Sequence, residues 1–499
     1  MSLTIYNTLS HTKEPFVPLQ KGIIKMYVCG MTVYSDAHIG HARTYVAFDV
    51  IRRYFEYKGY KVTYVQNITD VDDKIIAASQ KEGIDPLKYS ERFTERCLGD
   101  LDALGIRRAD LYPKASATIP DMIQMIQKIL ANGYGYEADG DVYFSVERSQ
   151  NYGKLSGQDI DQMKAGARIE PGESKRNPLD FALWKKAKPG EPSWDSPWGK
   201  GRPGWHIECS AMSGKYLGLP FDIHGGGMDL RFPHHENEIA QAEAATGTEF
   251  AKYWLHVGLL TINGEKMSKS LGNIVNVRDL LQRYDAEVIR MFIAQAHYRS
   301  PPDFNEKTLS DVQKGLERIY RVKERLEEQA KQTSKKEKAK KKESKEEQQY
   351  HDALKAFQTD FEQAMDDDFN TPKAFAALFE FVNKTNKFLE DSSSPSSELC
   401  ASALSLMNKI GNVLTLFQLK ITRTTQDDTQ KEQQLDGLLQ KYTITVQGSL
   451  DDLLRALLQA REDARKRKDW KTADGIRKDL EAIGFEIQDT AEGPVWRKR

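Results

Sequence analysis

The segment between Ile24 and Gln66 constrains the fold of this chain more than any other part of the sequence. Apolar residues alternate along Ile24–Val28, which predicts a short strand. A helical pattern begins near His38 and ends at Gly59, and the β-branched run Val62–Val65 then predicts a buried parallel strand. A strand, a helix and a strand in this order form a βαβ unit. We therefore expect the first half of a doubly wound nucleotide-binding fold.

Length, charge and cysteine content limit the class of protein further. A chain of 499 residues predicts about three domains. The 72 Lys and Arg residues nearly balance the 73 Asp and Glu residues, so any contact with nucleic acid must be confined to local basic faces. The N-terminus lacks an apolar signal region, and no stretch approaches the roughly 18 apolar residues of a membrane span. We expect a cytoplasmic protein that does not contact membranes.

The four cysteines are too few and too widely spaced for a disulfide framework in a chain of this size. Reduced thiols, some of them metal ligands, are the better interpretation. Cys29 ends the first predicted strand, and Cys209 follows an expected strand or turn. His234 and Glu238 lie four residues apart on a predicted helix, so they share a face. Two thiolates, an imidazole and a carboxylate form a credible zinc set. His235 is a rival ligand that helical spacing does not exclude, and burial as small hydrophobic residues is the alternative for the cysteines.

The string His38-Ile39-Gly40-His41 stands where the first helix begins. A helix start presents unpaired amide groups and the positive end of the helix dipole, where a triphosphate binds most easily. His38 and His41 can face the same side and donate to phosphate oxygens, and Gly40 lets a nucleotide approach the backbone closely. The alternative is a histidine-rich helix start that only caps itself.

A second string, Lys266-Met267-Ser268-Lys269-Ser270, lies in a loop that we expect to be introduced by Asn263-Gly264 and to close over a triphosphate. The attack of a carboxylate on an α-phosphate needs alignment and cations more than proton transfer, and Lys266 and Lys269 suit that task. A solvated lysine loop is the alternative. Together the two strings indicate ATP and the activation of a carboxylate.

The two strings resemble the HIGH and KMSKS signatures of class I aminoacyl-tRNA synthetases. Three further segments, Tyr27–Tyr34, Asn67–Lys74 and Gly204–Ser210, resemble the cysteinyl-tRNA synthetase family, and the resemblance extends over most of the chain. It implies an enzyme, an ATP-dependent ligase that forms cysteinyl-adenylate and transfers cysteine to tRNA(Cys). His38, His41, Lys266 and Lys269 would then stabilise the transition state of the first step.

The resemblance also implies one zinc ion per chain, held by Cys29, Cys209, His234 and Glu238, and only the resemblance favours His234 over His235. Zinc prefers a thiolate to a neutral hydroxyl, so direct ligation of the substrate would separate cysteine from serine. Mg²⁺ is expected with ATP. Core packing is the alternative for Trp205, and a satisfied buried histidine is the alternative for His224. The implied substrate contacts are Gly30, Thr32, Gly40, Thr69, Trp205, His224, Gly225, Gly226, Asp229 and Lys269.

The second half of the chain resembles the RNA-binding parts of the same family. Asp366–Pro372 is similar to the entrance of a helical bundle, and Asp469–Asp474 to an anticodon-binding end, where Trp470 or Trp496 would either stack on bases or pack in the core. The stretch Lys335–Gln349 departs from the family pattern and predicts a solvated helix or a disordered insertion.

We therefore expect an α/β fold with a Rossmann-type parallel-sheet catalytic domain split by an insertion, then an α-helical bundle and a small C-terminal anticodon-binding domain. The expected boundaries are 1–119 and 205–262 for the two catalytic halves, 120–204 for the connective insertion, 263–302 for the KMSKS loop and stem-contact region, 303–420 for the bundle with its charged insertion near 335–349, and 440–499 for the C-terminal domain.

The expected partners are tRNA(Cys), ATP and L-cysteine, and we expect a monomer. Two rival functions differ in class. One is a cysteine ligase that passes cysteine to an amino sugar, but such enzymes lack a full anticodon-binding end, whereas this chain continues to Arg499. The other is a non-catalytic RNA-binding protein derived from a synthetase, which would not require both phosphate-binding strings.

Overall fold

The computed structural model of the chain describes two compact units, Met1–Leu419 and Lys420–Arg499, and each is treated by itself. The described residues are 2–158, 174–268, 271–331, 344–392, 395–417, 426–444, 446, 450–490 and 493–498.

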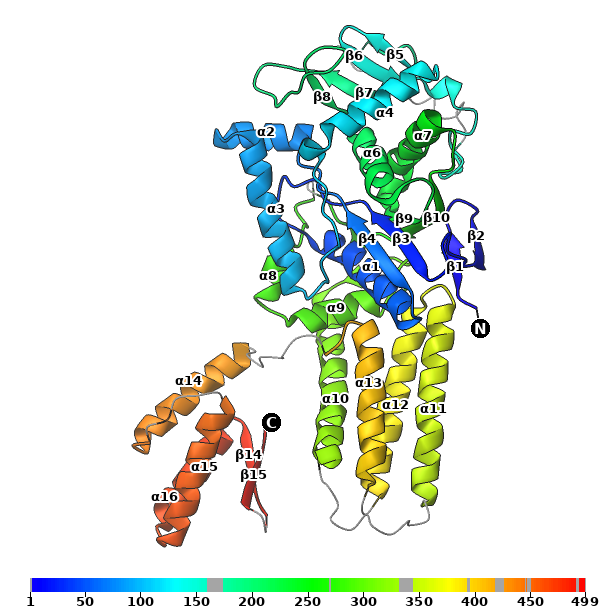
Figure 1. Cartoon of the computed structure of the whole chain (residues 1–499). Coiled ribbons are helices and arrows are strands. Elements are labelled where there is room, and N and C mark those ends of the chain that lie inside the picture. The colour runs from blue at the N-terminus through cyan, green and yellow to red at the C-terminus, as the bar shows by residue number, and fades with distance from the viewer. Residues whose placement is uncertain are drawn as a thin grey trace. The chain divides into compact units, whose positions relative to one another are not determined.

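A four-stranded parallel sheet forms the middle of the first unit (Figure 1). Its strands stand in the order β10 (Ala251–Val257), β9 (Phe221–Gly227), β3 (Ile23–Val28) and β4 (Lys61–Gln66), and every neighbouring pair is parallel. Helix α1 (Ile39–Tyr57) connects β3 to β4. The predicted strand, helix and strand and the expected α/β class are therefore confirmed.

Both faces of this sheet are covered by packed residues. Alternate residues of a strand point to opposite faces, so β3 contributes to a core on each side. Ile24, Met26 and Val28 of β3 pack in one core with α1. Tyr27 and Cys29 pack in a second core on the other face, with residues of α6 (Trp205–Leu217) and α7 (Glu236–Thr246). A sheet enclosed in this way presents ligand sites only at its ends.

A smaller antiparallel sheet interrupts the two halves of the parallel sheet, as the expected insertion requires. It is ordered β5 (Gly135–Ala138), β6 (Asp141–Phe144), β7 (Phe181–Lys186) and β8 (Gly201–Pro203), and α4 (Ile119–Ala131) precedes it. Other α-helices and strands described in this unit are β1 (Thr4–Asn7), β2 (Thr12–Pro15), α2 (Asp73–Glu82), α3 (Pro86–Ala103), β11 (Thr261–Ile262), β12 (Glu265–Lys266), α8 (Val277–Leu281), α9 (Ala286–Ala294) and β13 (Asp303–Phe304).

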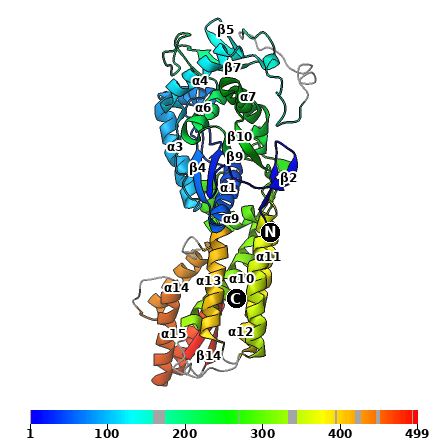
Figure 2. The same ribbon diagram turned by 45° about the vertical axis from the view of Figure 1, so that its right-hand side comes forward.

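Four long helices form the expected bundle and lie side by side in both ribbon views (Figures 1 and 2). They are α10 (Glu306–Lys331), α11 (Lys345–Asp366), α12 (Thr371–Asp391) and α13 (Ser397–Val413). Asp366 fastens the bundle to α1, because it accepts a 2.7 Å hydrogen bond from the Tyr54 hydroxyl and pairs with Lys58. Of the charged stretch, residues 344–349 cap and begin α11, and residues 335–343 lie outside the described part of the chain.

The second unit consists of α14 (Gln426–Lys441), α15 (Leu450–Lys466), α16 (Trp470–Ala482), β14 (Phe485–Thr490) and β15 (Gly493–Lys498). Its core includes Leu435, Leu457, Ile476 and Phe485. Trp470 is 57% exposed, so core packing does not account for it. The side chain of Trp496 lies outside the described residues.

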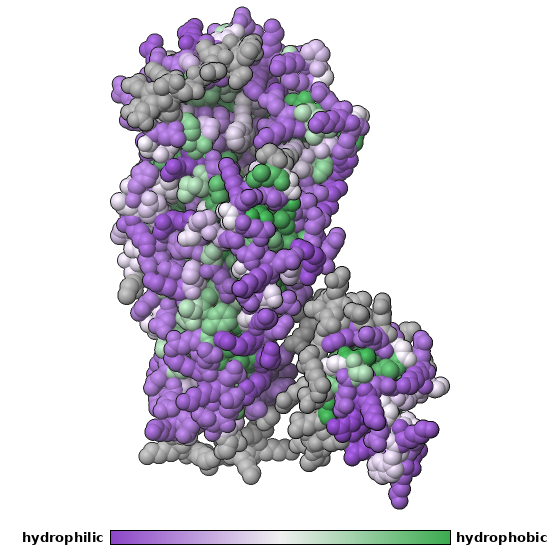
Figure 3. All heavy atoms as spheres, turned by 180° about the vertical axis from the view of Figure 1, so that it is seen from behind, coloured by the Kyte–Doolittle hydropathy of each residue, from purple (hydrophilic) through white to green (hydrophobic). Residues whose placement is uncertain are grey.

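Hydrophilic residues cover most of the face of the molecule seen in Figure 3, and hydrophobic residues gather there in local patches. Among the helices that the structure describes, none combines the length and the apolar character needed to cross a membrane.

Candidate active site and metal centre

Loops at the carboxyl edge of the parallel sheet bring several of the predicted site residues together. The loop after β3 runs beside the loop after β4, because Thr32 pairs with Thr69. The backbone N–H of Gly30 donates a 2.7 Å hydrogen bond to Asn67 Oδ1. A Cβ on Gly30 would stand 1.7 Å from the Asn67 carbonyl oxygen, so only glycine permits this approach.

The rings of His38 and His41 stack at the start of α1, with centroids 3.6 Å apart and planes 14° from parallel. The backbone N–H of His38 donates to His41 Nδ1 at 3.2 Å, and the backbone N–H of His41 donates to His38 Nδ1 at 3.3 Å. A neutral imidazole that accepts at Nδ1 carries its proton on Nε2. The helix cap therefore assigns both rings the tautomer in which Nε2–H is the donor.

Asn263-Gly264 form the turn of a tight hairpin that leads into the lysine string, which corrects the loop expected at these two residues. These two residues, both with positive φ (50° and 80°), turn between β11 and β12, as Asn-Gly pairs commonly do. Lys266 ends β12 and is exposed, and the side chain of Met267 lies against Gly40. Lys269 and Ser270 lie outside the described residues.

The four predicted metal ligands form one buried cluster, with a candidate ligand atom from each within 4.8 Å of the others. The sulfur atoms of Cys29 and Cys209 are 3.8 Å apart, and His234 Nε2 lies 2.9 Å from Glu238 Oε1. Two sulfurs about 2.3 Å from a tetrahedral zinc ion would stand about 3.8 Å from each other, so the thiol pair fits that metal. The donor set and its spacing are consistent with zinc.

Cys209 lies on a helix, and its expected position after a strand or turn is wrong. Helix α6 begins at Trp205, and residues 207–213 are all buried. Because the helix is buried on nearly every side, its sequence lacks the amphipathic period that identifies helices. Gly204 at its N-cap supplies no side-chain cap. Neither usual sequence signal marked this helix.

His235 also reaches the cluster and belongs to a second possible donor set with Cys29, His224 and Glu238. His235 Nε2 lies 3.3 Å from Cys29 Sγ but 4.0 Å from Glu238 Oε1, and its Nδ1 is 2.8 Å from His256 Nε2. The set with His234 contains two sulfurs and the set with His235 contains one. Zinc prefers thiolate ligands, so the chemistry of the donors favours the set that contains His234.

Electrostatic interactions in the cluster favour the charged forms of Cys209 and Glu238. Burial would raise the pKa of Glu238, but His224 and His234 hold the pKa of that carboxyl well below its usual range. Burial would also raise the pKa of the Cys209 thiol, but a hydrogen bond from Cys29 helps to lower it below its usual value. For Cys29 itself, burial raises the pKa. A thiolate at Cys209 and a carboxylate at Glu238 are the forms that bind metal.

The other predicted contacts lie around this cluster. The Trp205 ring, 37% exposed, stacks on His234 with centroids 4.2 Å apart, so it is not simple core. His224 is buried, stacks on Trp254 and lies 2.6 Å from Glu238 Oε2 through Nε2. Asp229 is exposed in the turn after β9.

Gly225 and Gly226 lie in strand β9, and their space is taken by the protein itself. A Cβ on Gly225 would stand 2.1 Å from the Phe48 ring of α1, and one on Gly226 would stand 2.9 Å from the His235 ring. Packing of the helix on the sheet accounts for Gly225.

Comparisons with known proteins show which family the chain resembles. Residues 15–314 match the family described as tRNA synthetases class I (C) catalytic domain, residues 360–418 match the DALR domain, and residues 448–497 match the cysteinyl-tRNA ligase anticodon binding domain. The chain is 48% identical over 498 residues to a cysteine–tRNA ligase of Thermococcus gammatolerans, covering 100% of this chain and 99% of that protein.

The chain belongs to the cysteine–tRNA ligase family. A cysteine–tRNA ligase of Geobacter sulfurreducens is also 48% identical, over 497 residues and 100% of both chains. The predicted enzyme class, an aminoacyl-tRNA ligase, is confirmed.

Solved structures show the same fold at low sequence identity. Methionyl-tRNA synthetase of Mycobacterium tuberculosis in complex with methionyl-adenylate matches with a TM-score of 0.59 at 15% identity, over 79% of this chain and 89% of that chain. Leucyl-tRNA synthetase of Agrobacterium radiobacter, in a ternary complex, matches with a TM-score of 0.58 at 13% identity, over 80% and 85%. The fold of this chain is therefore shared with these two synthetases, in agreement with the class I catalytic-domain model that it matches.

Sequence reasoning missed several groups around the cluster. His206 Nδ1 lies 2.9 Å from His234 Nδ1, and His256 joins His235 to Thr8, whose Oγ1 lies 2.9 Å from His256 Nδ1. His206 stands inside a segment already recognised as family-like, and that position could have identified it. His256 lies in the apolar strand β10, where no sequence signal marks it.

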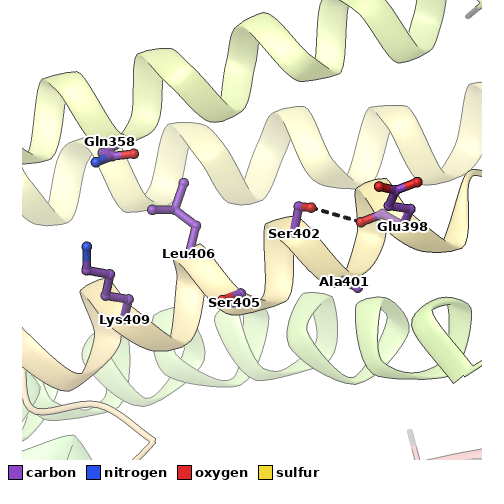
Figure 4. Close-up of a pocket in the computed structure, with 7 residues that line it drawn as sticks. All are labelled: Gln358, Glu398, Ala401, Ser402, Ser405, Leu406 and Lys409. Carbon is purple, nitrogen blue, oxygen red and sulfur yellow. Dashed lines mark hydrogen bonds between the residues drawn. The ribbon is translucent and has the colours of Figure 1, made fainter.

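A shallow hollow on the helical bundle lies apart from this site (Figure 4). Gln358 of α11 and Ser402 and Lys409 of α13 line it, and Ser402 donates a 3.0 Å hydrogen bond to the Glu398 carbonyl along its own helix. The hollow brings together no donor set for a metal and no part of the two signature strings.

Proposed function

We propose that this cysteine–tRNA ligase activates L-cysteine at the carboxyl edge of its parallel sheet through the residues assembled there. The cysteine carboxylate attacks the α-phosphate of ATP to give cysteinyl-adenylate and pyrophosphate, and a terminal hydroxyl of tRNA(Cys) then takes the cysteinyl group. The observation that supports this assignment most strongly is the buried cluster of Cys29, Cys209, His234 and Glu238, because it adds a thiol-selective donor set to an ATP-binding edge.

In the first step His38 and His41 act as paired hydrogen-bond donors. Their caps hold Nδ1 as the acceptor in each ring, so the two stacked rings offer Nε2–H groups to phosphate oxygens without changing protonation state. Lys266 and Lys269 supply positive charge to the same phosphates. Donors that are already oriented stabilise a transition state without the cost of reorganisation. We assign Mg²⁺ to the bound ATP and no protein ligand to it.

Cys29, Cys209, His234 and Glu238 would hold one zinc ion per chain. A zinc ion there would provide a coordination position that prefers the substrate thiolate to a hydroxyl. His206 would orient His234, and His224 would orient Glu238, because ligands are commonly fixed by such hydrogen bonds. The stack of Trp205 on His234 covers one side of the cluster.

The remaining proposed substrate contacts lie around the same carboxyl edge of the parallel sheet. Gly30, Thr32 and Thr69 border the substrate on the loops after β3 and β4, whose contacts hold them together. The residues proposed to complete the wall for cysteine and adenosine are Gly40, Trp205, His224, Gly225, Gly226, Asp229 and Lys269.

We propose that residues 440–499 bind the anticodon stem-loop and that residues 263–302 contact the acceptor side, with 120–204 as the connective insertion and 303–420 as the bundle. The exposed ring of Trp470 at the start of α16 is available to stack on a base. The enzyme is proposed to act as a cytoplasmic monomer.

Two assays on the zinc-loaded full chain test this function. Cysteine-dependent exchange of pyrophosphate into ATP should occur with no RNA present, and radiolabelled cysteine should become attached to tRNA(Cys). Exchange without tRNA charging, together with transfer of cysteine to an amino sugar, would favour the rival ligase. Absence of exchange with zinc and magnesium supplied would favour a non-catalytic RNA-binding protein.

A further inference from the structure

The segment after the lysine string is joined to the start of the histidine string. The backbone N–H of Ile39 donates to the Val275 carbonyl at 2.9 Å, and the N–H of Val277 donates to the Ala37 carbonyl at 2.9 Å. His38 and Asn276 pair between them as an antiparallel bridge. The two proposed ATP-binding strings are therefore attached at one short ladder.

A row of alternating charges reinforces this ladder. Arg278, at the start of α8, lies 3.4 Å from Asp36 Oδ1 through its NH2 nitrogen and donates a 3.0 Å hydrogen bond to Asp100 Oδ1. Asp36, two residues before His38, also accepts two 2.7 Å hydrogen bonds from Arg96 of α3. The side chain of Asp100 is 8% exposed and that of Asp36 is 19% exposed, so water screens these contacts only in part.

The ladder fixes the lysine string itself through Asn273. The Asn273 side chain accepts a 2.9 Å hydrogen bond from the backbone N–H of Ser268 and donates a 3.2 Å hydrogen bond to the Lys266 carbonyl. The Met267 side chain rests against Gly40 in the histidine string. The position of Lys266 therefore depends on the segment that Arg278 anchors.

We propose that Arg278, acting on Asp36, is a positioning residue for the ATP half of the reaction. Its guanidinium anchors the segment that places Lys266 and Met267 next to the histidine string, where the phosphates of ATP would bind. This inference rests on the proposed function of the two strings. These contacts of Arg278 and Asp36 do not involve the metal cluster. Breaking the Arg278–Asp36 pair should therefore weaken the use of ATP and leave cysteine binding unchanged.

A purely structural role for the pair predicts something different. If Arg278 only stabilised the fold, its loss would lower the melting temperature and would lower kcat/KM for ATP and for cysteine to the same extent. If it positions the lysine string, kcat/KM for ATP falls while KM for cysteine does not change. The split between the two substrates is therefore the informative measurement.

The experiment uses pyrophosphate exchange by the zinc-loaded full chain with Arg278→Gln, Asp36→Asn and the double variant. We expect each single change to lower kcat/KM for ATP roughly fivefold, the size of a partly buried ion pair worth about 1 kcal/mol, with KM for cysteine unchanged within about twofold. The double variant should lose less than the product of the two single losses, because both changes break the Arg278–Asp36 contact besides their separate contacts with Asp100 and Arg96. Arg278→Lys should recover part of the loss.

Arg283→Gln is the matched control, because Arg283 lies just after α8 and pairs with the exposed Glu306 at 2.9 Å. It should leave both substrates' parameters unchanged. If Arg278→Gln fails to fold, Asp36→Asn decides the question, since an ATP-selective loss is still required of it. Equal losses for ATP and cysteine, additive losses in the double variant, or the same loss in Arg283→Gln would overturn the proposal. Failure of the unaltered chain to catalyse exchange would instead overturn the proposed function.

Discussion

At the scale of single residues, the helix cap at the start of α1 predicts that both members of the histidine string are needed. Each imidazole accepts a backbone hydrogen bond from the other residue, so neither tautomer is free to change. Removing one ring would release the other from its orientation. A simple histidine-rich helix start would provide the cap, but the fixed pair of Nε2–H donors is what suits phosphate.

The pKa of His41 provides a test of this arrangement. Burial and then the neighbouring His38 lower the pKa of His41 well below its usual 6.5. The unfolded chain takes up this proton near pH 6.5 and the folded chain does not, so the contribution of His41 to stability is present above that pH and decreases as the pH falls below it. In an NMR titration of the folded protein the His41 ring signal should not shift between pH 8 and about 6. A midpoint near 6.5 would contradict the half-buried, capped geometry of His41.

The choice between two adjacent histidines is a second question at this scale. The two-sulfur set predicts that His234→Ala loses zinc more readily than His235→Ala, by roughly 10- to 100-fold in the apparent dissociation constant. Competition with a chromogenic chelator measures both variants, with Cys97→Ser as a control because Cys97 is buried away from the cluster. A larger effect of His235→Ala would reassign the ligand.

At the scale of elements, the packing of α1 on β9 sets how closely the histidine string approaches the sheet. The Phe48 ring fills the space above Gly225. We expect Gly225→Ala to lower the free energy of unfolding by about 1–3 kcal/mol, because its methyl group would overpack this contact. Chemical denaturation measures the change.

Gly99→Ala is the matched control, since Gly99 lies on α3 with nothing within 4 Å of a built Cβ. It should leave stability unchanged or raise it by up to about 1 kcal/mol. If Gly225→Ala were as stable as Gly99→Ala, the contact with Phe48 would not be the reason for this glycine.

Local signals predicted some elements well and others not at all. The unit β3-α1-β4 could be predicted because strand alternation, a capped helix start and Gly59 agree with one another. Helix α6 was missed because it is buried nearly all round and lacks a side-chain cap. The sequence predicts a loop at Asn263-Gly264 and not the observed hairpin, because its strands, β11 and β12, have only two residues each.

At the scale of the whole molecule, the metal cluster could not be derived from spacing. Cys29 and Cys209 are 180 residues apart and meet only because β3 pairs with β9 and α6 packs on the same face of the sheet. The sequence contained the donor types, and family resemblance selected among them. The supporting histidine His256 became evident only from the fold, whereas His206 lies in a segment that the family resemblance already marks.

The division into two compact units leads to a prediction about the two steps of the reaction. The residues proposed for adenylate formation all lie in Met1–Leu419. A chain that stops at residue 419 should keep cysteine-dependent pyrophosphate exchange within about threefold, while charging of tRNA(Cys) falls by roughly 100-fold or more because phosphate and base contacts are lost. Comparable charging by the shortened and full chains would contradict the assignment of anticodon binding to the second unit.

The central claim is that the buried cluster makes an ATP site selective for a thiol. The most direct test compares cysteine- and serine-dependent pyrophosphate exchange in the unaltered protein and in Cys209→Ser, with Cys400→Ser as the control because Cys400 is equally buried but lies in the bundle. We predict exchange with cysteine and none with serine in the unaltered protein and in Cys400→Ser, and a loss of roughly 100-fold or more with cysteine in Cys209→Ser. Equal exchange with serine and cysteine in the unaltered protein, or full activity in Cys209→Ser, would contradict it.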